Sequence, residues 1–438
     1  MLQDAWGHDI TTTSQEAAEA YNRAALEFLE YRLTLGETVK GLLAIDGDCV
    51  MGLCFRGYMM MQFGSTALYP KVRGVLEQAE ARAGDATPRE QLHIKALNCW
   101  LNGKVREARQ HWQSIVVSHP RDLLALRLHH FMSFWQGDRL GLRDLPAGAL
   151  AAAEDGMPGY GFLLSMAAFG LEENGDYVRA EEYGRQAVAR NSGDLWGVHA
   201  VAHVLEMQCR HKDGISFLDQ PFGTWEDRNP FKDHVWWHTA LFALELGEYD
   251  RVLDIYDREI EAGDSGFYLD VQNAASMLMR LKLYGVEVGD RWEPLAELAM
   301  QRKSDHVMPF TDAHFLMALA GAGKNDDTES YRQSIMAFGE DESSDAAEVT
   351  REIGVPLANA LCAYGASRYA EAADILYGIR HNLAPIGGSH AQQDVFHQIM
   401  IDAATQAGKT DMARSLLHER MMLRPGTLWA SERLAALN

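Results

Sequence analysis

Residues 169–188, FGLEENGDYVRAEEYGRQAV, contain the pattern that decides the fold. A helix-forming segment runs into an Asn-Gly-Asp-Tyr turn, and apolar residues at helical period follow the turn. Glycine suits the turn because the backbone there needs a freedom that a Cβ would obstruct. This stretch therefore predicts two helices joined by a short loop.

The same phrase recurs along the chain of 438 residues, least clearly after Gly285. Its turn position falls at Gly64, Gly103, Gly137, Gly175, Cys209, Gly247, Gly285, Gly323, Ser367 and Gly408. Most spacings are 34, 38 or 39 residues, and a period of about 34 with two helices per unit is the tetratricopeptide signature.

We therefore predict an all-α fold in which tetratricopeptide-type helical-hairpin repeats form one right-handed superhelical solenoid. The solenoid is expected to span residues 1–438 with about ten hairpins, because no low-complexity linker divides the chain. The last units, at about residues 345–438, are expected to close the concave groove.

Charge and composition exclude several classes of partner. The net charge of −22 repels phosphate backbones and anionic membranes, so nucleic acid and membrane are not expected as partners. Five cysteines without a CxxC pair suit a reducing compartment. No signal peptide or long apolar window is visible, and the sequence predicts a cytoplasmic protein.

Counting back from each turn gives the polar side chains of the first helices a helical address. His199, His203 and Glu206 lie ten, six and three residues before Cys209, and His234 and His238 lie thirteen and nine before Gly247. Ser276 lies nine residues before Gly285. Asp312 and His314 lie eleven and nine residues before Gly323. Steps of three or four residues keep side chains on one helix face. We therefore expect histidines from three units to converge on the concave surface, with Ser276 joining them.

A further pair, His390 and Asp394, follows the Gly-Gly turn of GGSHAQQDVFHQ. This position predicts a helix N-terminus, whose backbone N–H groups and partial positive charge suit an anionic group of a ligand.

Two histidines four residues apart on a helix can both reach one metal ion. The candidate metal ligands are His199, His203, His234 and His238, and zinc is the first candidate among divalent ions. The segment is not an HExxH motif, because Ala200 follows His199; Glu206 is a ligand or an orienting partner instead. The competing interpretation is that these histidines are buried and satisfied by neighbouring carboxylates and carbonyls.

Other chemistries lack their motifs, since no GxSxG, Walker A or post-strand GxGxxG sequence is present. Any catalysis would use the histidine and carboxylate set, through metal-assisted hydrolysis as the first hypothesis or through histidine acid–base chemistry. The candidate catalytic residues are His199, His203, Glu206, His234, His238, Asp312, His314, His390 and Asp394. Trp237 and Ser276 are candidates for lining the pocket of a cofactor or ligand.

Longer phrases resemble the tetratricopeptide repeat protein 38 family, which is grouped with StaR-like proteins of antibiotic gene clusters. These phrases include DAWGHDITTTSQEAAEAY, WGVHAVAHVLEMQCRHKDGISFL, HVWWHTALFALELGEYD, PFTDAHFLMALAGAGK and IGGSHAQQDVF, and the likeness covers nearly the whole chain. The resemblance implies an all-helical repeat fold and places the candidate catalytic residues in the family's characteristic phrases. It implies no agreed activity; a flavoprotein oxygenase role has been suggested within the family, and this sequence has no dinucleotide motif to support it.

Two functions remain open from the sequence. In the first, a pocket in the concave face binds a small molecule or peptide, with the histidines and carboxylates holding a metal ion or moving protons. In the second, the groove is a non-catalytic scaffold that binds a partner peptide. The sequence leaves the oligomeric state open, with a homodimer among the alternatives.

Overall fold

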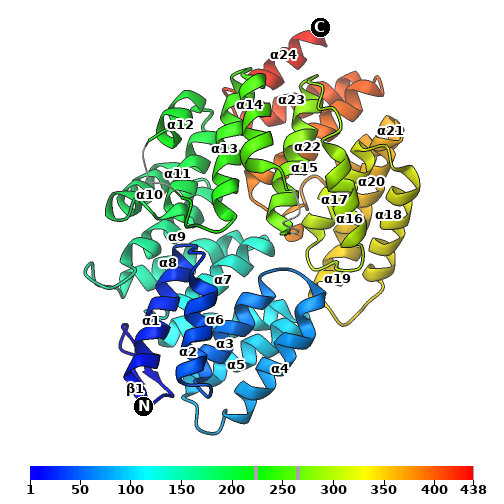
Figure 1. The fold of residues 1–438 in the computed structure, drawn as a ribbon. Helices are drawn as coiled ribbons and strands as arrows, with labels where there is room; N and C mark the ends of the chain where they lie inside the picture. Colours follow the sequence, from blue (N-terminus) through cyan, green and yellow to red (C-terminus); the bar gives the residue numbers. More distant parts are fainter. Residues whose placement is uncertain (221–224, 263–266, 438) are drawn as a thin grey trace.

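The computed structural model describes residues 1–220, 225–262 and 267–437, and these residues form a chain of paired helices (Figure 1). Two short strands, β1 (Leu2–Gln3) and β2 (Asp9–Ile10), pair antiparallel at the N-terminal end. The predicted all-α, tetratricopeptide-type fold class is confirmed.

The helices follow one another as hairpins of a first and a second helix. An N-terminal hairpin consists of α1 (Gln15–Leu29) and α2 (Leu35–Ile45). The next hairpins pair α3 (Val50–Met61) with α4 (Tyr69–Ala81), α5 (Pro88–Leu101) with α6 (Val105–Ser118), α7 (Leu123–Trp135) with α8 (Arg139–Ala151), α9 (Tyr160–Glu173) with α10 (Tyr177–Arg190), and α11 (Leu195–Met207) with α12 (His211–Leu218). The later hairpins pair α13 (Phe231–Glu245) with α14 (Tyr249–Ile255), α15 (Tyr268–Leu283) with α16 (Trp292–Gln301), α17 (Pro309–Gly321) with α18 (Asn325–Gly339), α20 (Val355–Gly365) with α21 (Tyr369–Ile379), and α22 (His390–Gln406) with α23 (Thr410–Leu423).

Short elements join or end the hairpins. They are the 3-10 turns η1 (Thr66–Leu68) and η4 (Ala384–Ile386), the π-helical turns η2 (Tyr256–Ile260) and η3 (Thr350–Gly354), and the helices α19 (Asp345–Val349) and α24 (Leu428–Ala436). No helix in the described ranges is long and apolar enough to cross a membrane.

All ten predicted turn residues have a positive φ, between +55° at Cys209 and +79° at Gly175. This left-handed conformation ends the first helix and frees the chain to reverse into the second. Gly285, where the sequence pattern is least clear, has a φ of +78° and belongs to the series. Ser367 occupies the same conformation, with a φ of +59°, without the freedom of a glycine.

First and second helices differ sharply in burial. All thirteen residues of α11 are buried, whereas α10 buries only Ala180, Gly184 and Ala187. A second helix buries one face against its own hairpin and its neighbours. The first helix α11 is also covered by protein on its inner side.

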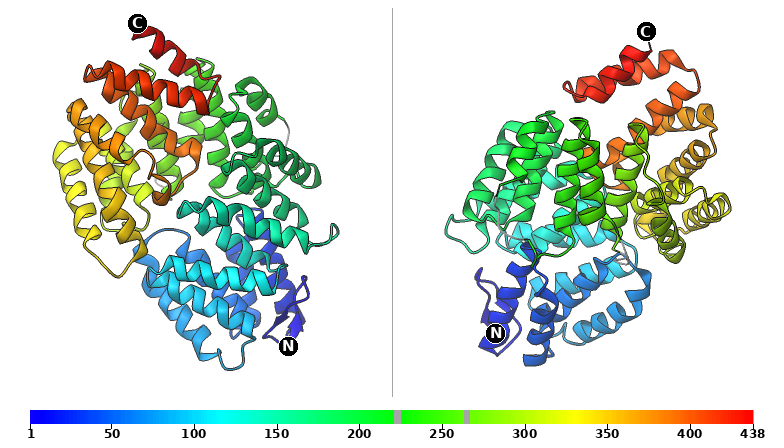
Figure 2. Two further views of the ribbon diagram at one scale, coloured as in Figure 1. Left: turned by 180° about the vertical axis from the view of Figure 1, so that it is seen from behind. Right: turned by 45° about the horizontal axis from the view of Figure 1, so that its top comes forward.

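Two sets of contacts cover the interior of the solenoid. The N-terminal units meet the later units, since Asp345 N–H donates to Gly103 O at 3.0 Å and Arg106 pairs with Glu348 at 2.7 Å. The helix α22, shown in orange in Figure 2, contacts α11 and α15 as well as its chain neighbour α21. Its Ala391 carbonyl accepts a hydrogen bond from Arg280 of α15 at 2.8 Å.

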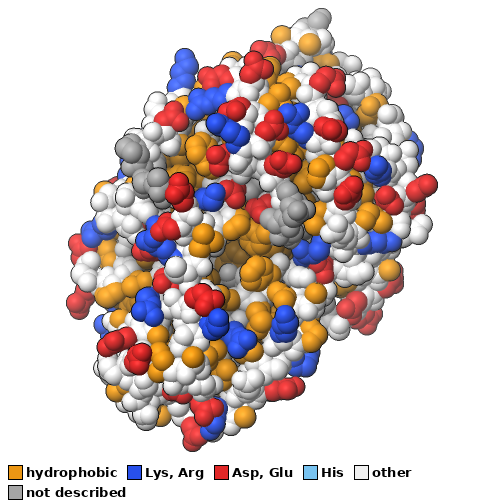
Figure 3. Space-filling view, viewed as in Figure 1, with side chains coloured by type: hydrophobic (Ala, Val, Ile, Leu, Met, Phe, Trp, Pro, Cys, Tyr) orange, Lys and Arg blue, Asp and Glu red, His pale blue; other side chains and the backbone are white. Residues whose placement is uncertain are grey.

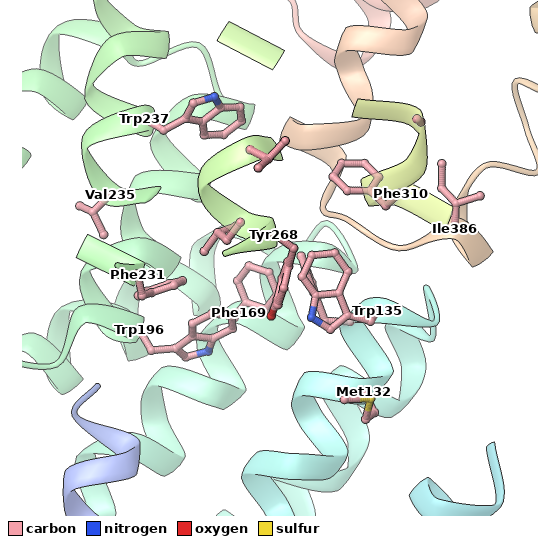
Figure 4. Packing of buried hydrophobic residues seen from close by; sticks show 14 of the residues in the cluster. Met132, Trp135, Phe169, Trp196, Phe231, Val235, Trp237, Tyr268, Phe310 and Ile386 are labelled. Atoms are coloured by element: carbon pink, nitrogen blue, oxygen red, sulfur yellow. The ribbon is translucent and has the colours of Figure 1, made fainter. Parts of the chain in front are cut away.

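Aromatic side chains fill much of the space where these elements meet (Figure 4). Trp135 of α7 packs edge-on to Tyr268 of α15 with ring centroids 5.5 Å apart, and Trp196 packs against Phe169 at 4.7 Å. Figure 3 shows hydrophobic side chains gathered in a hollow near the centre of one face. A cavity of about 390 Å³, lined by residues that include Trp135 and Tyr268, lies where the N-terminal units meet the later ones.

Candidate metal centre

Four histidines meet between the neighbouring first helices α11 and α13. His199 and His203 are four residues apart on α11, and His234 and His238 are four apart on α13, so each pair occupies one face of its helix. Each histidine offers one ring nitrogen within 4.8 Å of those of the other three. The ring centroids of His203 and His238 are 4.5 Å apart, and all four side chains are at most 3% exposed.

Polar neighbours orient two of the four rings, and a third ring lies close to a carboxylate. The Nδ1 atom of His238 lies 2.9 Å from the carboxylate of Glu206, and that of His234 lies 2.7 Å from the side-chain oxygen of Asn273. His203 Nδ1 is 3.5 Å from a carboxylate oxygen of Glu172.

A carboxylate or amide oxygen only accepts, so the bonded Nδ1 of His238 and of His234 carries the proton and leaves Nε2 with a free lone pair. Metal-binding histidines commonly have this arrangement, because the partner fixes the tautomer and raises the basicity of the ligand nitrogen.

Five other ring nitrogens have no such partner in the described part of the chain. They are both nitrogens of His199, both nitrogens of His203, and Nε2 of His238. A buried polar group without a partner costs about 1–3 kcal/mol. Three of the four histidines carry that cost at one point, which makes the group a candidate binding site.

Burial sets the protonation of this group. It lowers the pKa of His199 and His234 well below the ordinary value, and that of His238 to about 4. The imidazoles are therefore neutral near pH 7, which is the form that binds a metal ion.

Burial also raises the pKa of Glu206, but the hydrogen bond with His238 and the charge of Arg424 outweigh it and hold that pKa below its ordinary range. Glu206 is therefore an anionic partner of a neutral histidine.

The donor set fits a first-row transition metal. Neutral imidazole suits zinc, copper, iron and nickel. Tetrahedral zinc with bonds of about 2.0–2.1 Å would bring the nitrogens to about 3.4 Å from one another, so the rings need to close by small side-chain rotations. The four histidines can hold such an ion, with Glu206 and Asn273 as the outer partners of two of them.

Aromatic rings enclose the histidines. Phe169 stacks on His199 at 5.3 Å, and Trp237 stacks on His234 at 5.2 Å with an interplanar angle of 14°. The Trp237 Nε1–H donates to the Ser276 hydroxyl at 3.1 Å. Trp237 and Ser276, predicted to line a pocket, are therefore bonded to one another in the wall beside the histidines, and both are buried.

His314 does not join the four. Its Nδ1 lies 2.7 Å from the backbone oxygen of Phe310, and its ring packs against Phe396 of α22. The physical reason is that α15 lies between α13 and α17, and α15 carries Asn273 and Ser276 rather than histidine at this level. The expected convergence therefore involves two units and not three.

Asp312 is also apart from the centre. It accepts a hydrogen bond from the Tyr331 hydroxyl of α18 at 2.8 Å and lies 3.0 Å from His306 Nδ1. Side chains two positions apart on a helix point about 200° away from one another, so Asp312 and His314 face opposite sides of α17. Asp312 faces its own second helix.

The two C-terminal candidates face the centre from α22. The backbone N–H of His390 donates to Glu173 Oε1 at 3.3 Å, and its ring Nδ1 lies 3.7 Å from Glu173 Oε2. The negative group at this helix start is thus a carboxylate of the chain itself. Asp394 pairs with Arg420 and lies 4.0 Å from Arg424, and Arg424 also approaches Glu206 at 3.3 Å.

Sequence reasoning missed Glu172, Glu173, Asn273 and Arg424. One signal was available for Glu172, because it lies three residues before Gly175 and so has the address that Glu206 has before Cys209. No comparable signal marks Arg424, which reaches the centre from the end of α23, 218 residues after Glu206.

Comparison with known proteins leaves the site as the main source of information about function. No family model matches the chain. A similar solved structure is that of Naa15/Naa10 bound to HypK-THB, with 10% sequence identity and a TM-score of 0.26. The match covers 97% of this chain and 66% of that chain, so the chain spans just under two thirds of the length of its neighbour. A likeness at this level says nothing about function.

Proposed function

We propose that this protein is a metal-binding helical-repeat protein, with a divalent transition-metal ion held by His199, His203, His234 and His238. The observation that carries the proposal is the meeting of four buried imidazoles whose ligand atoms lie within 4.8 Å of one another. The hydrogen bonds that His238 and His234 donate to Glu206 and Asn273 support it, because they leave the Nε2 lone pairs of these histidines free to bind. Zinc is the first candidate ion.

The reaction class that we propose first is metal-assisted hydrolysis of a small molecule. Four histidines fill a tetrahedral ion, so this reaction requires a fifth coordination position, where the ion would lower the pKa of a bound water and so supply hydroxide near neutral pH. Glu206 would hold His238 in place, and the aromatic rings would keep bulk water out. A small ligand is favoured over a long peptide because the inner helices are buried almost throughout.

The family and setting are proposed together. The phrases shared with the tetratricopeptide repeat protein 38 family support membership of that family, with the whole chain acting as one solenoid whose last units cover the metal centre. Cysteine usage supports a cytoplasmic setting.

The deciding experiment is metal analysis of protein purified without an affinity tag or chelator. We expect the wild-type chain to contain about one more zinc or other transition-metal ion than the double variant His199→Ala/His238→Ala, because two of the four ligands of this site are gone. The matched control is His314→Ala, which removes a buried histidine bonded to a backbone oxygen and should keep the ion.

Metal content well below one ion in the wild-type chain would overturn the proposal. So would an unchanged content in the double variant. Circular dichroism of each variant separates loss of metal from loss of fold.

The second candidate function is a protein-interaction scaffold, with which the helical-repeat fold is consistent. The specific observation in its favour is the cavity of about 390 Å³ between the N-terminal and later units, which is well separated in its lining from the four histidines. Recovery of one stoichiometric protein partner, lost on changing Trp135 or Tyr268 but kept in His199→Ala/His238→Ala, would favour this function over the metal centre.

A further inference from the structure

A second group of metal-ligand side chains lies beside the four histidines. Glu172 and Glu173, at the end of α9, and His390, at the start of α22, each offer one ligand atom within 4.8 Å of the other two. We propose that these three residues hold a second divalent cation, so that the interior contains a two-metal centre. The inference rests on the proposed function, which supplies the first ion.

Burial and missing partners are the first support. Glu172 is 0% exposed and Glu173 is 3% exposed. Neither carboxylate oxygen of Glu172 has a hydrogen-bond partner in the described residues, and the same holds for Nδ1 of His390. A buried carboxylate is rarely left in this state, because its charge needs a hydrogen bond, a proton or a cation.

The charges around the pair are the second support. Two neighbouring carboxylates repel one another strongly in a low-dielectric interior. One cationic side chain close to the pair is that of Arg139, whose Nε lies 3.7 Å from Glu173 Oε2 and which is 37% exposed. Arg424 is shared with Glu206 and Asp394. A divalent ion between Glu172 and Glu173 would neutralise both.

Adjacency links the two sites. Glu172 Oε2 lies 3.5 Å from His203 Nδ1, so a ligand of the second site touches a ligand of the first. His203 has two ring nitrogens, neither of which has a hydrogen bond in the described residues, and its Nδ1 is the one beside Glu172. Two carboxylates and one imidazole suit manganese, iron or zinc, whereas four imidazoles suit zinc, copper, iron or nickel. Paired ions of this kind can activate a water and stabilise a leaving oxygen in hydrolysis.

The rival occupant is a proton. Burial, followed by the charge of Glu206, raises the pKa of Glu172 to about 8, and its carboxyl group is close enough to Glu173 to share a hydrogen. A shared proton would satisfy the pair without a metal. The stoichiometry of metal binding distinguishes the two occupants.

The test uses untagged full-length protein stripped with chelator and titrated separately with Zn²⁺ and Mn²⁺. Calorimetry and elemental analysis after dialysis give the number of bound ions. We expect two Zn²⁺ per wild-type chain, one in Glu172→Gln/Glu173→Gln and one in His199→Ala/His238→Ala. The matched control is Glu245→Gln. Glu245 is a partly buried glutamate at the end of α13 that accepts a hydrogen bond from the Tyr284 hydroxyl, and this variant should still bind two ions.

Each outcome separates this inference from the proposed function. One ion in the wild type that survives Glu172→Gln/Glu173→Gln and is lost in His199→Ala/His238→Ala overturns the second site and keeps the first. Two ions retained in Glu172→Gln/Glu173→Gln also overturn the second site. No bound ion in any form overturns both.

A second measurement needs no variant. Two Mn²⁺ ions held side by side interact magnetically, and the electron paramagnetic resonance spectrum of wild-type protein loaded with two equivalents should show a spin-coupled signal. Because four imidazoles suit copper better than manganese, the same protein loaded with one equivalent of Cu²⁺ and then one of Mn²⁺ should also show coupled signals. Separate signals of isolated Cu²⁺ and Mn²⁺, with both ions bound, would contradict neighbouring sites.

Discussion

Two groups of buried histidines on first helices of this protein differ in whether their ring nitrogens have hydrogen-bond partners. In the N-terminal units, His93 of α5 is 0% exposed, with Nδ1 3.1 Å from the Tyr58 hydroxyl and Nε2 3.2 Å from Asp122 Oδ2. Arg89 donates to the same Asp122 oxygen at 2.6 Å. In the middle units, His199 is equally buried and neither of its ring nitrogens has a partner.

The difference shows what burial alone does not reveal about a histidine. Both ring nitrogens of His93 have hydrogen-bond partners within the protein, so this side chain joins α5 to its neighbours. His199, His203 and His238 each leave a ring nitrogen without a hydrogen bond in the described residues, and a bound ion would offset that cost. The four-histidine group is therefore a candidate binding site, and the His93 network is part of the core.

The largest effect is expected from breaking the N-terminal network. Asp122→Ala leaves Arg89 buried without its main partner and also removes the cap of α7, where Asp122 accepts from Ala125 N–H at 2.9 Å. We expect destabilisation of about 3–5 kcal/mol, measured by urea denaturation of metal-free protein. Metal content should not change; loss of the ion on this substitution would break the distinction between the networks.

Added metal should stabilise the chain in large part through the four-histidine group. At a free Zn²⁺ concentration about 100 times the dissociation constant of that group, binding there should add about 2.7 kcal/mol against unfolding. His93→Gln should gain as much as the wild type from its own lower baseline, and His199→Ala/His238→Ala should gain about 2.7 kcal/mol less than the wild type. Equal stabilisation of all three would mean that the ion binds elsewhere.

A smaller effect is expected from the partner of His238. Glu206→Gln keeps an oxygen that can accept from Nδ1 but removes the negative charge. Changes at such partners weaken metal affinity by about 10–100-fold, and we expect a decrease in that range by competition with a chromophoric chelator. An affinity that changes less than twofold would show that Glu206 does not orient a ligand.

The smallest effect is a pH dependence. Burial lowers the pKa of His238 to about 4 and that of His234 well below 6.5. The unfolded chain takes up protons below about pH 6.5 while the folded metal-free chain does not. The contribution of these histidines to stability is therefore complete above that pH and decreases as the pH falls toward 4.

The same pKa values predict proton release on metal binding. At pH 6.0, four ordinary histidines would release about three protons when an ion binds, whereas four that are already neutral release almost none. Calorimetry in two buffers with different ionisation enthalpies measures the number. Release of about three protons would contradict neutral imidazoles in the metal-free centre.

Most of the fold could be predicted because its signals are local. Each turn residue adopts a positive φ for reasons contained within one hairpin, and this holds even at Gly285 and at Cys209, which is not a glycine. The His199/His203 and His234/His238 pairs could also be predicted, because their addresses repeat within adjacent units. The prediction that His314 joins the other histidines was wrong. His314 lies as far before its turn as His238 does, but α15 lies between their two helices.

The sequence by itself therefore determined the hairpin repeat and brought four histidines onto facing sides of two neighbouring helices, since both depend on separations of at most one unit. Only the tertiary structure decided what surrounds them. Glu206 meets Arg424 from 218 residues away, and Glu173 meets the start of α22 from 217 residues away. These contacts depend on how the solenoid turns back on itself. That curvature is the sum of many small rotations between units, so no single segment of the sequence determines it.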